Sequence, residues 1–203
     1  MSQPRVYLTL ILCCPLLVIA QDRSSNFRDS TSMVVMTEDS GAQSCYRAAS
    51  IAARIHYSSK KELESCSYAL NRSAMTQRDR AATLTNRGII FMALGEYDAA
   101  IQDFTGALKL NPEFGEIHVN IGNIYFLDSE FDKAIGEYSA AIDTKAARVH
   151  IAHINRGMAY ENLGDFDSAE KDYREAMILI PDSALPQLKL DQLFRKKADI
   201  NPE

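Results

Sequence analysis

The chain has no excess of positive charge, and this absence limits the classes of partner that it can bind. Its 203 residues include 22 lysines and arginines against 27 acidic residues, which gives a net charge of -5. Nucleic-acid binding and polybasic membrane binding both need a cationic surface. We therefore expect neither nucleic acid nor an anionic membrane as a partner.

Signatures of catalysis and of metal binding are also missing. The sequence contains no glycine-rich phosphate loop and no G-x-S-x-G turn. Three of its four histidines, His118, His150 and His153, lie near one another in a repeated pattern, but no carboxylate or cysteine is placed to complete a metal shell. The sequence predicts no enzyme activity, no cofactor and no metal.

The chain has no apolar run long enough to span a bilayer. The longest runs from Val6 to Ala20, includes Pro15 and has 15 residues, whereas a spanning helix needs about 20. A single arginine precedes it, and Val18-Ile19-Ala20 resembles a cleavage site. Residues 1–20 are therefore predicted to be a cleaved signal peptide. The alternative is an uncleaved anchor, the one case in which a membrane would be a partner.

Cysteine is scarce in the exported part of the chain. Cleavage after Ala20 would leave only Cys45 and Cys66. Paired cysteines are common in oxidising compartments. If the two cysteines lie on facing antiparallel helices with a turn near Ser58, however, they are offset by several residues along the helix axes. A bridge needs Cα atoms within about 7 Å. A disulfide and two buried thiols both stay open.

What the chain does contain is a repeat. In residues 81–114 small residues and aromatic residues alternate along two amphipathic segments, roughly 82–94 and 97–110. The first ends at Leu94-Gly95 and the second before Asn111-Pro112, which are both helix-stop signals. The small residues are Gly88, Ala100 and Ala107, and the aromatic residues are Phe91, Tyr97 and Phe104. Small residues let two helices approach closely, and the rings fill the remaining space.

The same spacing returns twice. Residues 115–149 carry Gly122, Tyr125, Phe131, Ala134, Tyr138 and Ala141, and residues 150–183 carry Gly157, Tyr160, Phe166, Ala169, Tyr173 and Ala176. This pattern resembles the tetratricopeptide repeat family, over residues 81–183. The resemblance implies an all-α fold, an α-solenoid of antiparallel helix pairs. Two features depart from the family: Leu84, His118 and His153 replace the usual tryptophan, and Ala146 replaces the terminal proline.

The flanks extend this pattern less clearly. Residues 21–43 are polar and predict a flexible linker. Residues 44–80 predict a degenerate helical hairpin, with Asp79 capping the next helix. Residues 184–203 predict a capping helix, about 186–197, that places Leu190, Leu193 and Phe194 on one face.

The resemblance also implies a concave groove lined by the first helix of each unit. Eleven candidate partner-binding residues follow from this alignment: Thr85, Asn86, Ile89, Met92, Val119, Asn120, Asn123, Phe126, Ile154, Asn155 and Met158. Most are apolar, which favours an apolar peptide or amphipathic helix as ligand. Alternatively, the linker or the C-terminal helix covers the groove. The carboxylate clamp of some family members is absent, because Thr85 and Ile89 occupy its places.

Two polar patterns recur on the same helices. Asn86, Asn120 and Asn155 repeat at one position and either bind a ligand backbone or satisfy neighbouring helix groups. Two arginines, Arg87 and Arg156, occur in the units that also carry Asp103 and Asp172, and we expect structural ion pairs between them.

Taken together, the sequence predicts an exported adaptor or scaffold, most simply in a bacterial periplasm, that holds a segment of a partner protein. The alternative is a self-associating structural subunit, a homo-oligomer in which the groove and the C-terminal helix of neighbours pack together.

Overall fold

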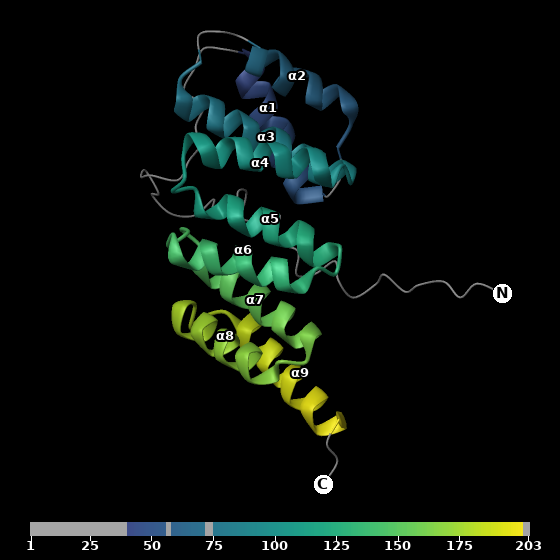
Figure 1. Ribbon diagram of the computed structural model, residues 1–203, viewed down its shortest axis with the longest axis vertical. Helices are drawn as coiled ribbons and strands as arrows, with labels where there is room; N and C mark the ends of the chain where they lie inside the picture. The colour runs from purple at the N-terminus through teal and green to yellow at the C-terminus, as the bar shows by residue number, and fades with distance from the viewer. Residues whose placement is uncertain (1–39, 56–57, 72–74, 201–203) are drawn as a thin grey trace, which may run out of the picture.

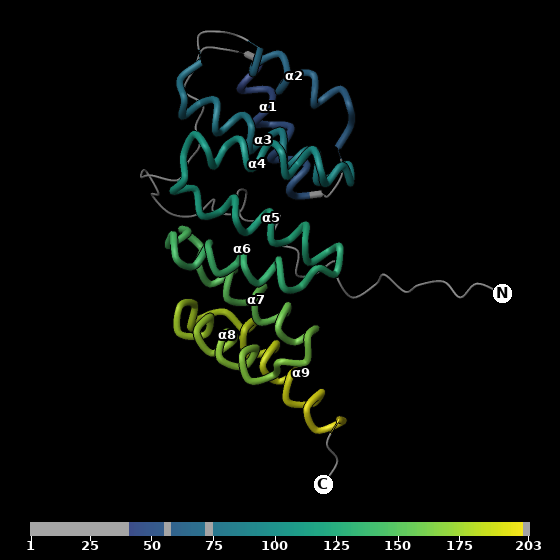
Figure 2. The backbone as a smooth tube through the Cα atoms, in the orientation of Figure 1, coloured from purple at the N-terminus to yellow at the C-terminus, as the bar shows by residue number. Residues whose placement is uncertain are grey.

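The computed structural model describes residues 40–55, 58–71 and 75–200, and every regular element in these ranges is an α-helix. The predicted all-α fold is confirmed. Figures 1 and 2 show the helices following one another down a single stack. Their bounds are α1 Ser40–Ile55, α2 Lys60–Asn71, α3 Gln77–Leu94, α4 Tyr97–Leu110, α5 Gly115–Leu127, α6 Phe131–Asp143, α7 Val149–Leu163, α8 Phe166–Leu179 and α9 Ala184–Ile200.

The helices pair into antiparallel hairpins that stack into a solenoid. The hairpins α3/α4, α5/α6 and α7/α8 occupy the three repeats, with α1/α2 before them and α9 after them. In Figure 1 the turns within the hairpins lie on the right edge of the stack. None of the described helices combines the length and apolarity needed to cross a membrane. The run Val6 to Ala20 lies outside the described residues.

The ends of the helices follow the predicted stop signals. Gly95 ends α3 with φ of 76°, and Gly164 ends α7 with φ of 80°. In this left-handed conformation the N–H of Gly95 donates back to the carbonyl of Met92 at 3.0 Å. The middle hairpin has no glycine there and uses Ser129, with φ of 62°, instead. Helix α4 ends at Leu110, before Asn111-Pro112, as predicted.

The start of α3 corrects one prediction. Asp79 was expected to cap a helix that begins near residue 82, but α3 begins at Gln77 and its cap is Thr76. The Thr76 hydroxyl accepts from the backbone N–H of Asp79 at 3.1 Å and donates to the Asp79 carboxylate at 2.8 Å. Asp79 is therefore a first-turn residue that completes the cap, where its negative charge also favours the helix dipole.

The limits of the flanking segments shift as well. Residues 40–43, expected in the linker, already belong to α1, and residues 21–39 lie outside the described ranges. Helix α9 is longer than the predicted 186–197. Of its expected apolar face, Leu190 and Leu193 are buried, whereas Phe194 is 41% exposed.

Each repeat is held together by a glycine on the first helix and a ring on the second. A Cβ atom added at Gly88 would lie 2.6 Å from the ring of Phe104, and one added at Gly122 would lie 2.6 Å from the ring of Tyr138. The corresponding distance from Gly157 to the ring of Tyr173 is 2.7 Å. All three rings are fully buried. These positions need glycine because the ring fills the space of a side chain.

The junctions between hairpins are not equal. Helix α5 faces the preceding hairpin with Ile117, Ile121 and Ile124, all buried. The aligned residues of α7 are Ala152, Arg156 and Ala159. Helices α4 and α5 pack less closely than α6 and α7, and Figure 1 shows the wider separation. The bulk of three isoleucines accounts for this spacing.

The contact between glycine and ring predicts that alanine substitutions at two glycines of the same hairpin change the stability of the protein in opposite directions. Gly122→Ala should destabilise the protein by about 1–3 kcal/mol, because the new methyl group overpacks the Tyr138 ring. Gly136→Ala in α6 is the control, since a Cβ there meets nothing within 4 Å. The control should gain about 0.5–1 kcal/mol from helix propensity. Urea unfolding of both variants measures the difference, and equal stabilities would contradict it.

Candidate protein-interaction site

The predicted groove residues lie on the first helices of the three repeats, but they differ in accessibility. In α3, Thr85, Asn86, Ile89 and Met92 are all at most 5% exposed. Val119, Asn120, Asn123, Ile154 and Asn155 are also buried, whereas Phe126 and Met158 are partly exposed. Among the eleven, the accessible side chains are therefore Phe126 of α5 and Met158 of α7, and we call the surface around them the accessible inner face. A role for all eleven residues in binding stays a prediction.

Two asparagine side chains on the inner face have unused hydrogen-bond donors. The side-chain nitrogens of Asn86 and Asn123 are buried and have no hydrogen-bond partner. The Asn123 side-chain oxygen, in contrast, accepts from the Tyr138 hydroxyl at 2.8 Å and from the Asn155 amide at 2.9 Å. These bonds fix the orientation of the Asn123 amide. A buried donor without a partner costs about 1–3 kcal/mol, so each of these two amides is a local cost to stability inside the protein.

The predicted ion pairs are confirmed, and each also ties two hairpins together. Arg87 donates from Nε and Nη2 to the two oxygens of Asp103 at 2.7 Å each, and from Nη1 to Ser67 of α2 at 3.2 Å. Arg156 contacts Asp172 in the same way, at 2.9 and 2.8 Å, and donates to Ser139 of α6 at 2.9 Å. These arginines are structural links between neighbouring hairpins rather than free cationic groups.

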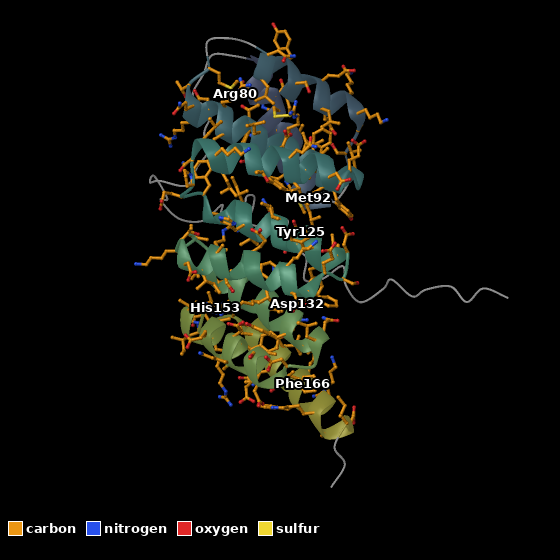
Figure 3. The ribbon with its side chains drawn as sticks, viewed as in Figure 1. Arg80, Met92, Tyr125, Asp132, His153 and Phe166 are labelled. Atoms are coloured by element: carbon orange, nitrogen blue, oxygen red, sulfur yellow. A yellow bond between two sulfur atoms is a disulfide. The ribbon has the colours of Figure 1, made fainter. Side chains whose placement is uncertain are left out.

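Two histidines have partners that the sequence analysis missed. His118 Nδ1 lies 2.7 Å from a carboxylate oxygen of Glu137, and His153 Nδ1 lies 2.8 Å from one of Asp172. Figure 3 labels His153 on α7. Each histidine and its carboxylate are 19 residues apart on the two helices of one hairpin, a spacing that could have revealed them. Among the described residues no three such groups gather into a metal site.

The Asp172 carboxylate has a pKa below its ordinary value. Burial acts to raise this pKa, but hydrogen bonds from Arg156 and His153 outweigh the burial and favour the charged form. The carboxylate is only 2% exposed. It is therefore held ionised inside the protein as the centre of a network that joins α6, α7 and α8.

The two cysteines form a disulfide. Cys45 of α1 and Cys66 of α2 have their Cα atoms 4.7 Å apart, within the range that a bridge requires. Of the two alternatives that the sequence left open, the structure has the disulfide rather than two buried thiols. The neighbouring helix positions are small and buried, Ala48, Ala49 and Ala69 among them, which lets α1 and α2 approach closely. The bridge lies in the hairpin farthest from the accessible inner face.

Comparisons with known proteins agree with this geometry. Profiles described as tetratricopeptide repeat match residues 85–148 and 150–183. In these ranges the chain is similar to tetratricopeptide repeats. The two matched ranges include the glycine and the ring of all three units described above. The remaining hairpin, α1/α2, lies outside both matches.

Two curated relatives share part of the chain. A lipoprotein NlpI homolog from Haemophilus influenzae is 25% identical over 99 residues, which cover 49% of this chain and 31% of that protein. Tetratricopeptide repeat protein 6 from Homo sapiens is 37% identical over 70 residues, which cover 34% of this chain and 14% of that protein. The chain therefore matches less than a third of either relative's length.

Solved structures with the same fold include repeat domains that bind peptides. The first such domain of Spaghetti (RPAP3), bound to an HSP90 peptide, has a TM-score of 0.55 and 24% identity over 59% of this chain and 94% of that one. A MamA variant has a TM-score of 0.62 and 19% identity over 79% of this chain and 86% of that one. Both likenesses establish the repeat solenoid fold.

The Asp172 network predicts a specific acid sensitivity. Because the folded pKa of Asp172 is lowered, its stabilisation is fully present above the unfolded pKa of about 3.9 and is lost as pH falls through the folded pKa. Asp172→Asn should be less stable than wild type at pH 7 and should lose less stability between about pH 5 and about pH 2. Asp132→Asn on the exposed start of α6 is the control. Identical pH slopes for wild type and Asp172→Asn would refute this role.

Proposed function

We propose that this chain is a protein-binding module that holds a segment of a partner protein against the inner face of α5 and α7. One observation carries the proposal. Phe126 of α5 and Met158 of α7 are the predicted groove side chains that stay accessible, while the asparagines beside them are buried. The peptide-bound repeat domain of RPAP3 supports the general mode of action.

The accessible side chains of the inner face favour an apolar segment. Phe126 and Met158 are partly exposed, and Leu127 is 43% exposed. Phe126 also packs edge-on against Phe131, with ring centroids 5.3 Å apart, which fixes its orientation. A rigid aromatic ring and a flexible methionine are suited to apolar side chains. Thr85 and Ile89 occupy the positions at which some family members clamp a terminal carboxylate. The acidic end of a peptide would therefore find no clamp at these positions.

The proposed setting is the envelope of a bacterium. The apolar run before Gln21 supports export, and the lipoprotein homolog from Haemophilus influenzae supports an envelope location. The disulfide between Cys45 and Cys66 suits an oxidising compartment. In this setting the chain acts as an adaptor that brings envelope proteins together without catalysing a reaction.

Self-association is a second candidate function. It is favoured by large apolar side chains that α8 and α9 leave exposed, among them Ile178 at 73% and Leu188 at 52%. Exposed apolar groups of this size commonly mark interaction sites.

Site-specific crosslinking tests the inner-face proposal. A photoreactive phenylalanine analogue at Phe126 should capture a distinct partner from native envelopes, because that ring is an accessible apolar side chain of the inner face. The same analogue at Tyr68 is the control, since that residue is 55% exposed on α2, outside the three repeats. The partner should be lost when Met158→Ser is added to the Phe126 probe. Crosslinks only to the protein itself would contradict the adaptor function.

Mass spectrometry of the secreted protein tests export. Expressed in a bacterium with its own N-terminus, the protein should appear in the periplasmic fraction and begin at Gln21, because Val18-Ile19-Ala20 directs cleavage. An intact chain in the membrane fraction would instead indicate an uncleaved anchor. An intact chain in the cytoplasm would contradict export altogether.

A further inference from the structure

Helix α9 occupies the place that the first helix of another repeat would take. Its residues Leu190 and Leu193 are 3% and 0% exposed and pack with Tyr173 and Ala176 of α8. Lys196 contacts the carboxylate of Glu161 at 3.1 Å and lies 5.6 Å from the centre of the Phe166 ring, which Figure 3 labels. Helix α9 is therefore anchored to the third repeat along one face.

The opposite face of α9 is a continuous exposed stripe, which we call the α9 stripe. It consists of Ala184, Gln187, Leu188, Asp191, Phe194, Arg195 and Ala198, all exposed, and each has another member of the set three or four residues away. Leu188 is 52% exposed and Phe194 is 41% exposed. This spacing puts the seven side chains on one side of the helix.

The stripe cannot receive a second helix in the manner of the three repeats. Those contacts need a glycine, since a Cβ at Gly157 would lie 2.7 Å from the Tyr173 ring. The aligned residue in α9 is Asp191, one repeat of 34 residues later. In a further hairpin of the same geometry, the Asp191 carboxylate would clash with the ring of the second helix. Whatever covers the stripe must therefore accommodate a negative charge.

The stripe carries both halves of an ion pair. Asp191 accepts a hydrogen bond from Gln187 at 2.8 Å, and Arg195 lies one turn further along. Arg195 makes none of the ion pairs found among the described residues, so its charge is available. Beside the stripe is a cavity of about 630 Å³ whose lining includes the carboxylates of Asp182 and Asp191 and no basic residue. The cavity suits a cationic side chain with an apolar stem.

We propose that the α9 stripe pairs with the same stripe of a second copy of this chain. In an antiparallel pair related by a two-fold axis level with Leu193, Arg195 of each copy faces Asp191 of the other. The same symmetry places Leu188 opposite Ala198 and brings the two Phe194 rings close to the axis. Each arginine enters the acidic cavity of its partner. A two-fold contact of this kind closes at the dimer.

Charge complementarity selects this occupant over an unrelated basic helix. A basic helix would neutralise Asp191 but would leave Arg195 facing a like charge, whereas the second copy neutralises both. The apolar residues of the stripe are few, so the interface belongs to the small class and the dimer should form in the micromolar range.

Charge reversal tests the proposal with the full-length mature chain. Sedimentation equilibrium from about 1 µM to about 500 µM should show a monomer and dimer equilibrium for the wild type. Asp191→Arg and Arg195→Asp should each raise the dissociation constant at least tenfold, because like charges then face each other. The double variant Asp191→Arg with Arg195→Asp should restore the dimer to within about threefold, because the pair is re-formed in reverse.

The controls separate this surface from others. Gln102→Arg adds the same charge to an exposed position of α4 and should leave the dissociation constant unchanged, and thermal unfolding should show that every variant stays folded. A wild type that is monomeric at all concentrations would overturn the proposal, and so would a dimer that resists both single reversals. Failure of the double variant to recover would also overturn it. None of these results bears on the inner-face crosslinks at Phe126.

Discussion

The close approach of a glycine and a ring within each hairpin is the contact on which the rest of the fold depends. Gly122 permits the Tyr138 ring to lie against the α5 backbone, and the hydroxyl of the same ring then reaches Asn123 at 2.8 Å. The packing contact therefore also orients the inner-face amide. In the first repeat the ring is Phe104, which has no hydroxyl, and the residue aligned with Asn123 is Ile89. One packing requirement thus sets both the hairpin geometry and the chemistry of the inner face.

The links between hairpins determine how rigidly the repeats act together. At two junctions an arginine joins a carboxylate of its own hairpin to a serine of the preceding one, through Arg87 and Arg156. At the middle junction Ile121 occupies the arginine position, and α4 and α5 are less closely packed. Apolar contacts lack the directional geometry of a bidentate arginine. Bending of the solenoid, where it occurs, should therefore concentrate between α4 and α5, at the edge of the accessible inner face.

The sequence predicted the repeats because their signal is periodic and local. Gly95 and Asn111-Pro112 mark helix ends regardless of context, and the Arg87 and Asp103 pairing follows from the repeat spacing. The missed features depend on relations between helices. The partners of His118 and His153 lie on the second helix of each hairpin, 19 residues away. The Cys45 to Cys66 bridge depends on how closely α1 and α2 approach, and the burial of Ile89 and Met92 depends on three-dimensional packing. None of these can be derived from the periodicity of one helix.

The two proposed surfaces have a joint consequence because they lie on different helices of the same stack. The accessible inner face lies on α5 and α7, whereas the α9 stripe lies on the last described helix. A two-fold dimer through α9 would present two inner faces held at a fixed separation. A partner with two suitable segments, or a partner that is itself a dimer, would then bind both faces at once. The second contact becomes intramolecular, so a weak apolar interaction at Phe126 and Met158 would suffice for stable capture. Self-association and adaptor function thus reinforce each other physically, because the dimer supplies the avidity that a small inner face lacks.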